Sequence, residues 1–246
     1  MEWMALLGIT LAVATAGIWY YKRKQKRTTM FLSIKSINFI IVQEVSSAAE
    51  YTQKYTHPVW PKGDSGITVG IGYDLGYHTR AEIEKDWTML PVQQRKLLSA
   101  CAGLKGANAE KYLKENKSVQ SLSIPFETAK QVFIRSTLPK AASEALAIYP
   151  GLNELLPDAA GAIISMVLNR GNSLKGERRI EMRQIVPLIQ QKDYHGIAQL
   201  IDHSKRLWIG IGMDGLVKRR EMEAALVKSS LRQYAANEII SISNHT

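Results

Sequence analysis

The sequence predicts an α+β fold that is mostly α, with a small β-hairpin lobe, a larger helical lobe and a transmembrane helix before both. A glycine-rich stretch with alternating apolar residues at 65–77 indicates the hairpin. Apolar residues in steps of three and four indicate the helices. An uncharged run at 3–21 indicates the membrane helix. The expected boundaries are an anchor and basic linker at 1–29, a main domain at 30–232 and a tail at 233–246.

The run at 3–21 would form a helix about 28 Å long, enough to cross a bilayer core. The aromatic residues at 19–21 would lie at the interface, and a basic stretch at 22–27 follows directly. A cleaved signal peptide is one alternative, but Glu2 and the absence of Lys or Arg before the run disfavour it. A buried core helix is the third option, which the terminal position and the basic stretch disfavour. We therefore expect a single-pass anchor in the inner membrane.

Two features of the sequence disagree on which side of the membrane the main domain lies. The positive-inside rule places the basic stretch at 22–27, and with it the main domain, in the cytoplasm. Three alternatives stay open if the substrate lies outside the membrane: insertion against the charge rule, export by a later event, or translation that starts at Met30.

A helix is predicted at 33–49, because apolar residues form one stripe along it. Glu44 lies on or beside this stripe, three residues after Ile41, so its carboxyl is partly removed from water, as a general acid working near neutral pH requires. A glutamate at the boundary whose carboxylate reaches solvent is the alternative. The residues of the stripe are Ile34, Ile37, Ile41, Val45 and Ala48.

Alternation at 65–77 indicates extended chain with one face on a core. The other face carries Thr68 and Asp74, separated by Gly70 and Gly72. In a straight strand the two polar residues would lie about 20 Å apart, so they serve one site only if the glycines allow a turn. The glycines also leave the backbone bare for another molecule. A plain glycine-rich hairpin is the alternative.

Helices are predicted for most of the remaining chain. Thr79 and Glu82 form a capping box, and Pro139 is expected to kink a long helix. The helix at 157–170 is the most apolar, so we expect it at the centre of the helical lobe. Arg219, in the last predicted helix, is interpreted as solvated or salt-bridged. The other helices after the central one are predicted at 178–190, 193–208 and 215–231.

Glu44, followed about two dozen residues later by Gly-Ile-Thr-Val-Gly-Ile-Gly-Tyr-Asp-Leu-Gly at 66–76, resembles the catalytic glutamate and hairpin of phage-type lysozymes. It is most similar to the pesticin-like branch, in which the aspartate follows the threonine. Asp64 precedes the threonine but lies in a turn sequence, so we interpret it as structural. Segments at 168–171, 205–208 and 215–220 extend the resemblance from about 31 to 232.

The resemblance implies a muramidase that cleaves peptidoglycan glycan strands in a cleft between two lobes, without metal or cofactor. Glu44 would be the proton donor, Asp74 the second carboxylate, and Thr68 the group that helps to place a water. Two carboxyls in unlike environments can divide acid and base roles. The expected substrate-binding residues are Gly70, Gly72 and Tyr73 on the hairpin, Trp60 and Trp208 as sugar platforms, and Asn169 and Arg170 at the end of the central helix.

These assignments have structural alternatives. Trp60 is as well explained by closing the edge of a small core, and Asn169 and Arg170 by capping their helix. A carboxyl separation of about 6.5–9.5 Å would predict inversion, and about 5–5.5 Å retention. A non-catalytic wall-binding module of a membrane-anchored lysis or secretion assembly is the rival to the muramidase, and a chitin or chitosan hydrolase is a third hypothesis.

The formal net charge is +10, of which residues 1–29 contribute five basic and one acidic side chain. The main domain is therefore basic in its own right, which suits an anionic wall polymer, lipid surface or nucleic acid. No helix-turn-helix, zinc-finger or aromatic RNA-binding motif is found, so nucleic acid is disfavoured as a partner. The single cysteine, Cys101, excludes an internal disulfide, and the five histidines have no metal-ligand spacing.

Overall fold

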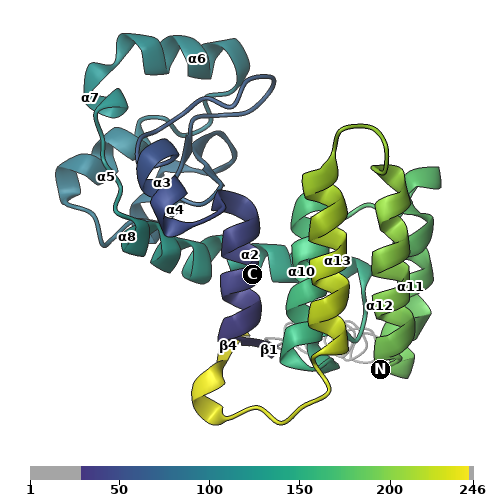
Figure 1. Ribbon diagram of the computed structural model, residues 1–246. Helices are drawn as coiled ribbons and strands as arrows, with labels where there is room; N and C mark the ends of the chain where they lie inside the picture. The colour runs from purple at the N-terminus through teal and green to yellow at the C-terminus, as the bar shows by residue number, and fades with distance from the viewer. Residues whose placement is uncertain (1–28, 244–246) are drawn as a thin grey trace, which may run out of the picture.

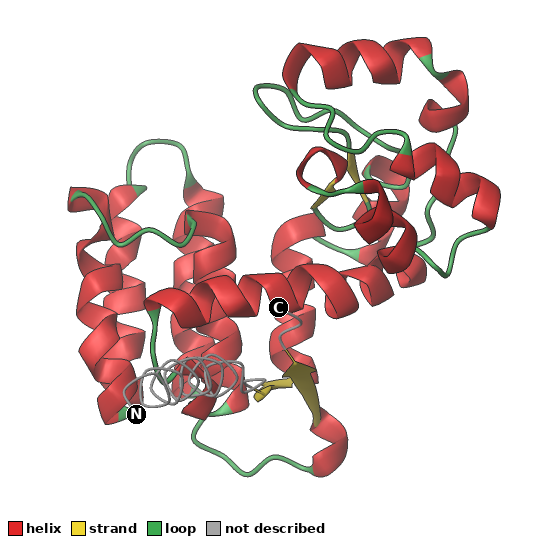
Figure 2. Cartoon of the chain, turned by 180° about the vertical axis from the view of Figure 1, so that it is seen from behind, coloured by secondary structure: helices red, strands yellow, loops and turns green. Residues whose placement is uncertain are grey.

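The computed structural model describes residues 29–243, which form two lobes (Figure 1). We call residues 46–132 the hairpin lobe, and strand β1 (Thr29–Ser33) together with residues 138–243 the helical lobe. Two helical connections pass between the lobes. One is α2 (Ile34–Val45), and the other is a continuous helical segment, the long horizontal helix in Figure 2. That segment consists of α8 (Phe126–Val132), a π-helical turn at Phe133–Thr137 and α9 (Leu138–Ile148).

Short helices surround a small antiparallel sheet in the hairpin lobe, whereas longer helices pack side by side in the helical lobe. The elements of the hairpin lobe are α3 (Ala48–Lys54), β2 (Thr68–Val69), β3 (Tyr73–Asp74), α4 (Arg80–Asp86), α5 (Val92–Ser99), α6 (Gly106–Glu115) and α7 (Lys117–Gln120). Those of the helical lobe after α9 are α10 (Pro157–Arg170), α11 (Ile180–Gln191), α12 (Tyr194–His203), α13 (Asp214–Lys228) and β4 (Ile239–Ser243).

The prediction of a membrane helix within this fold is corrected. Within residues 29–243 no helix has the length and apolar content needed to cross a bilayer. Even α10, the most buried helix, has 14 residues and would span about 21 Å, less than the roughly 30 Å of a bilayer core. The predicted run at 3–21 lies outside the described residues. The described fold is therefore mostly helical with two small sheets, and has no transmembrane helix.

Helix α2 begins at an N-cap, Ser33, whose hydroxyl accepts a hydrogen bond from the Ser36 amide. It lies against α10 at Gly161, where a Cβ would overlap the Ser36 side chain. The predicted apolar stripe is confirmed at Ile37, Ile41 and Val45. It is wrong at its two ends, because Ile34 in the first turn is exposed and Ala48 belongs to the next helix.

The alternation predicted at 65–77 is confirmed: Ile67, Val69, Ile71, Tyr73 and Leu75 are all buried. Strands β2 and β3 pair in register, with Thr68 opposite Asp74. The chain therefore turns between these two residues, as the hairpin hypothesis requires.

Strand β4 pairs antiparallel with β1 along its whole length, from Thr29 opposite Ser243 to Ser33 opposite Ile239. This segment lies in the predicted tail at 233–246, for which the sequence indicated no regular structure. The two ends of the described chain thus meet at the base of α2 (Figure 1).

Candidate functional site

Glu44 lies in the last turn of α2, where the helix enters the hairpin lobe. Its side chain is 32% exposed. Oε1 accepts a hydrogen bond of 3.0 Å from Nη2 of Arg219, which belongs to α13 of the helical lobe and is 6% exposed. Oε2 accepts no hydrogen bond from any described residue. Glu44 is therefore a half-open carboxyl that is anchored across the junction of the two lobes.

Behind this pair lies a buried cluster of charges between α10 and α13. Glu223 Oε1 accepts hydrogen bonds from Arg219 Nε at 3.3 Å, Arg220 Nη2 at 2.8 Å and Ser165 Oγ at 2.6 Å. Arg219 Nη2 also donates to the Ser165 carbonyl at 3.0 Å. With Glu44, the cluster contains two guanidinium groups and two carboxyl groups, so its formal charges balance. Charges buried this deeply require such pairing.

Burial raises the pKa of Glu223, and the neighbouring Arg220, Ser165 and Arg219 oppose that change. Burial likewise lowers the pKa of Arg220. Both shifts have the same physical cause, the loss of water around a charged group. Arg219 was missed as a site residue, and of the two states expected for it, solvated or salt-bridged, the structure shows the salt bridge. The sequence did offer a signal: Arg219 and Arg220 precede Glu223 by four and three residues, so they can pair with it on one face of the last helix.

Asp74 is tied into the hairpin by both carboxylate oxygens. Oδ2 accepts from the Gly66 amide at 3.0 Å, and Oδ1 from the Gly76 amide at 2.8 Å. Gly66 has no room for a Cβ beside this carboxylate. Asp74 therefore fixes the hairpin, and backbone donors set the orientation of its carboxylate.

The hairpin residues expected to bind substrate differ from one another in access. Gly70 and Gly72 both have positive φ, 61° and 68°, as the turn requires. A Cβ at Gly70 would contact the Trp87 ring, whereas Gly72 faces open space. Tyr73 is buried, its ring is stacked 4.1 Å from His78, and its hydroxyl donates to Asp86 at 2.8 Å. Of the three, Gly72 alone leaves backbone accessible to a ligand.

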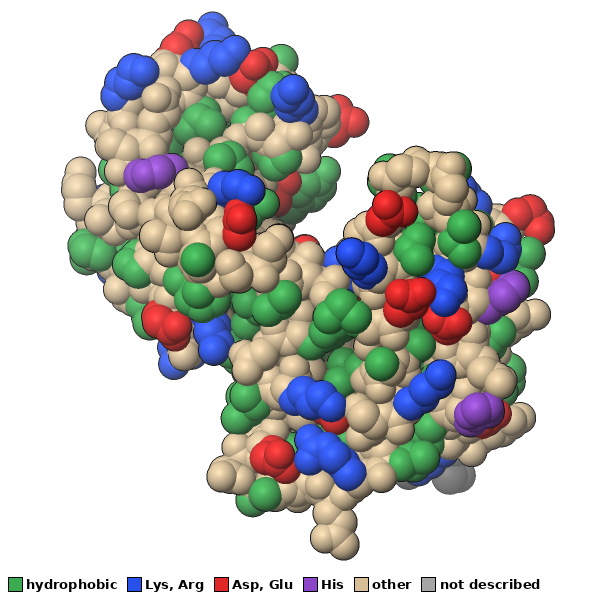
Figure 3. All heavy atoms as spheres, viewed as in Figure 1, with side chains coloured by type: hydrophobic (Ala, Val, Ile, Leu, Met, Phe, Trp, Pro, Cys, Tyr) green, Lys and Arg blue, Asp and Glu red, His purple; other side chains and the backbone are tan. Residues whose placement is uncertain are grey.

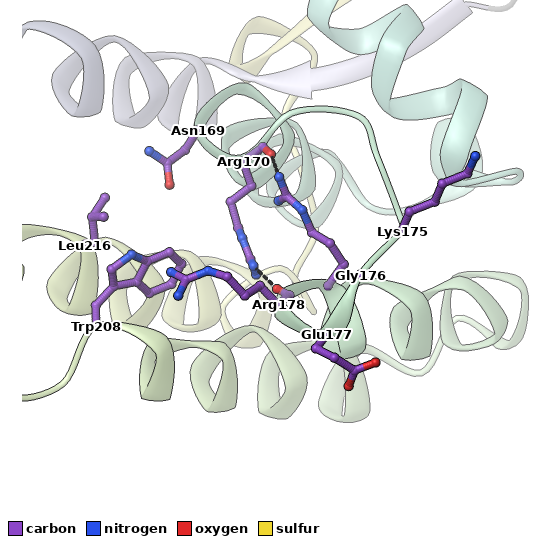
Figure 4. Close-up of a pocket in the computed structure, with 9 residues that line it drawn as sticks. Asn169, Arg170, Lys175, Gly176, Glu177, Arg178, Trp208 and Leu216 are labelled. Carbon is purple, nitrogen blue, oxygen red and sulfur yellow. Dashed lines mark hydrogen bonds between the residues drawn. The ribbon is translucent and has the colours of Figure 1, made fainter.

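Trp60 is half-buried, and its Nε1 donates to the Ser65 carbonyl at 3.1 Å. The ring packs against the core, which matches the structural alternative. Asn169, Arg170 and Trp208 lie together at the end of α10, and line one cavity of about 550 Å³ (Figure 4). Trp208 is 7% exposed and has the Arg170 guanidinium 5.2 Å from its ring centroid.

The predicted site residues thus form three groups: Glu44 at the lobe junction, the hairpin pair Thr68 and Asp74, and the cavity at the end of α10. Figure 3 shows the surface deeply hollowed between the lobes, with acidic and basic side chains on the facing walls. Glu44 and Asp74 bind different partners and share no hydrogen bond. Within residues 29–243 no cluster of three or more His, Cys, Asp or Glu side chains has metal-site geometry.

Comparison with known proteins gives one family match. Residues 42–146 match a domain of unknown function, DUF8812. The match covers less than half of the chain. It begins just before Glu44, contains the whole hairpin lobe and ends within α9, so Arg219 and the cavity at the end of α10 lie outside it. No curated protein matches the chain.

Proposed function

We propose that this chain is a peptidoglycan hydrolase, a muramidase that cleaves the β-1,4 bonds between N-acetylmuramic acid and N-acetylglucosamine. The observation that carries the proposal is the position of Glu44. Its carboxyl is partly exposed in the last turn of α2, which connects the two lobes, and a buried arginine of the helical lobe holds one of its oxygens. A general acid needs a fixed orientation and an open side toward the bond that it protonates.

In this mechanism Glu44 acts in its protonated form and transfers a proton from Oε2 to the glycosidic oxygen, which leaves the ionised Glu44 that balances the charges of the cluster. The bond from that oxygen to the anomeric carbon then breaks, and the leaving sugar keeps the proton as a hydroxyl group. Arg219 remains hydrogen-bonded to Oε1 and compensates the carboxylate that the transfer produces. The arginine thus stabilises the charge that develops on the acid.

A water supplies hydroxide to the anomeric carbon and gives up its own proton to a base. Asp74 retains one lone pair on each oxygen after accepting the two amide hydrogen bonds. It can therefore accept a hydrogen bond from a water that the Thr68 hydroxyl orients from the paired position. The amide donors keep the carboxylate in place, so Asp74 would act as the positioned base that takes the proton of the water. If Asp74 acts instead as an electrostatic stabiliser of the cationic transition state, the Glu44 carboxylate left by the first step takes that proton.

Release of reducing sugar from purified cell wall tests the proposal. Glu44→Gln keeps the shape of the side chain but removes its acid, so activity should fall by about 10²- to 10⁴-fold. Glu50→Gln is the matched control, because Glu50 is also a glutamate, lies on the next helix and pairs only with exposed Lys54. Equal activity of Glu44→Gln and the control would remove the acid role from Glu44.

A non-catalytic wall-binding module of a lysis or secretion assembly is the second candidate. The binding of both Asp74 oxygens by backbone amides favours it, because such a carboxylate has a structural task without any chemistry. Under this candidate the chain binds purified wall but releases no reducing sugar at any pH. The same assay therefore separates the two functions.

A further inference from the structure

The cavity at the end of α10 is formed by segments that are far apart in the sequence. They are the last residues of α10, the segment at 175–179 with its 3-10 turn, Trp208 after α12, and Leu216 at the start of α13. Figure 4 shows the Arg170 side chain descending from α10 toward the Arg178 backbone, with Trp208 beside it. The cavity measures about 550 Å³ and is open to the surface, so it has the size of a small-molecule subsite.

The cavity wall carries an excess of positive charge. Four of its residues are cationic: Arg170, Lys175, Arg178 and Arg179. The one lining carboxylate, Glu177, points away from Arg170 and Trp208 in Figure 4. No ion pair within residues 29–243 involves any of the four cations.

Arg170 is the most deeply placed of these cations, at 8% exposed. Its Nη2 donates to the Arg178 carbonyl, while Nη1 is buried without a hydrogen-bond partner among the described residues. Burial, together with the nearby positive charges of Arg179 and Arg220, lowers the pKa of Arg170 to about 10. A buried guanidinium with an unpaired N–H is costly, and an anion in the cavity would satisfy it.

Other groups of the cavity suit the same ligand. The indole of Trp208 forms an apolar wall beneath Arg170. The Asn169 amide oxygen accepts a hydrogen bond from Arg220 Nη2 at 3.3 Å, so the NH₂ group of the same amide is the part that can donate to a ligand. Arg220 is also bound to Glu223, so one hydrogen-bonded chain links the cavity to the cluster behind Glu44.

We propose that this cavity binds an oxyanion, a carboxylate or a phosphate, carried by the wall polymer whose glycan strand lies at Glu44. The inference rests on the proposed function, since it names a substrate group for the same protein. Two sources carry the required chemistry: the free carboxylates of peptide stems, and the phosphates of teichoic-type polymers. Both oxyanions accept charge-assisted hydrogen bonds from several arginines at once.

Binding to purified sacculi tests this inference separately from hydrolysis. The full chain with Glu44→Gln serves as the background, so that the wall stays intact during sedimentation. Lys175→Gln with Arg178→Gln removes two exposed cavity cations and leaves the buried Arg170 in place. The matched control is Lys218→Gln with Lys228→Gln, two exposed lysines of α13 that do not line the cavity.

The cavity variant should bind intact sacculi about 10-fold more weakly than the control, as expected for lost hydrogen bonds to a charged group. Enzymatic removal of the peptide stems abolishes this difference if the ligand is a carboxylate, and removal of phosphate polymers abolishes it if the ligand is a phosphate. Equal binding of variant and control overturns the inference. A difference that survives both treatments also overturns it, because general charge attraction would then explain binding.

The outcomes also separate this inference from the muramidase proposal. If the parent chain releases no reducing sugar but the binding difference persists, the muramidase fails and the oxyanion site stands. If the parent chain hydrolyses wall while cavity variant and control bind equally, the muramidase stands and the oxyanion site fails. Inorganic phosphate gives a second readout, since a bound anion raises the melting temperature of the control more than that of the cavity variant.

Discussion

The two cationic regions of the helical lobe differ in how their charge is compensated. Behind Glu44, two arginines face two carboxyls, and every charged group has a partner. At the end of α10, four cations line a cavity without an ion pair among the described residues, and one guanidinium nitrogen is buried and unpaired. The first region is balanced in charge, although Arg220 Nε and Nη1 and Glu223 Oε2 are buried there without hydrogen-bond partners among the described residues. The second region has an excess of positive charge, which is what a preformed anion site requires.

This comparison predicts that the balanced cluster is important for stability and the cavity is not. Arg219→Met would leave Glu223 and Glu44 with one arginine fewer, and should lower the free energy of unfolding by about 3–5 kcal/mol. Denaturant unfolding followed by circular dichroism measures the loss. Lys218→Met, at the exposed neighbouring position, should change the value by less than about 0.5 kcal/mol.

Removal of cavity cations, by contrast, should change the stability of the fold very little. Lys175→Gln with Arg178→Gln removes repulsion between unpaired charges, so the free energy of unfolding should stay within about 0.5 kcal/mol of the parent value. A loss as large as that of Arg219→Met would mean that these side chains have structural partners, and the contrast between the two regions would disappear.

An effect smaller than that of Arg219→Met is expected in the hairpin. Asn at position 74 has one acceptor oxygen, so Asp74→Asn leaves either the Gly66 or the Gly76 amide without its partner. This change should destabilise the fold by about 1–3 kcal/mol. Asp64→Asn, in the exposed turn before the hairpin, is the control. If both variants unfold at the same denaturant concentration, the hydrogen bonds to Asp74 do not hold the hairpin.

A further small effect is predicted in the pH dependence of stability at His78. Burial lowers the pKa of His78 below its usual 6.5, with a further contribution from Lys140. The unfolded chain therefore binds more protons at His78 than the folded chain does. As a result, the folded protein loses stability as pH falls from about 6.5 through the folded pKa of His78. As pH is lowered through this range, the melting temperature of His78→Gln should fall by about 2 °C less than that of the control His195→Gln, which removes an exposed histidine and keeps His78. Parallel curves would show that His78 does not contribute.

Local patterns in the sequence predicted the local parts of this site. Alternation at 65–77 and the glycines within it placed Thr68 opposite Asp74, because strand period and turn chemistry act over a few residues. Helical periodicity likewise placed Glu44 in a helix. The apolar run at 3–21, on which the predicted membrane helix depends, lies outside the described residues, and within 29–243 no helix is long and apolar enough to cross a bilayer.

Pairings between distant segments could not be predicted in this way. Glu44 and Arg219 are 175 residues apart, and the sequence around neither residue indicates that the other is its partner. The same applies to β1 and β4, whose pairing depends on where the helices between them bring the chain. Tyr73 was predicted in two incompatible ways. Alternation placed it on the buried face, which the structure confirms, whereas the resemblance implied that it binds substrate.

The identity of the reducing ends released from purified peptidoglycan tests the central claim most directly. Digestion with the full chain, followed by borohydride reduction and mass spectrometry, should give muropeptides that end in reduced N-acetylmuramic acid, and Glu44→Gln should give none above background. Products that end in reduced N-acetylglucosamine, or identical products from the Glu44→Gln chain, would contradict a muramidase that depends on the carboxyl at the lobe junction.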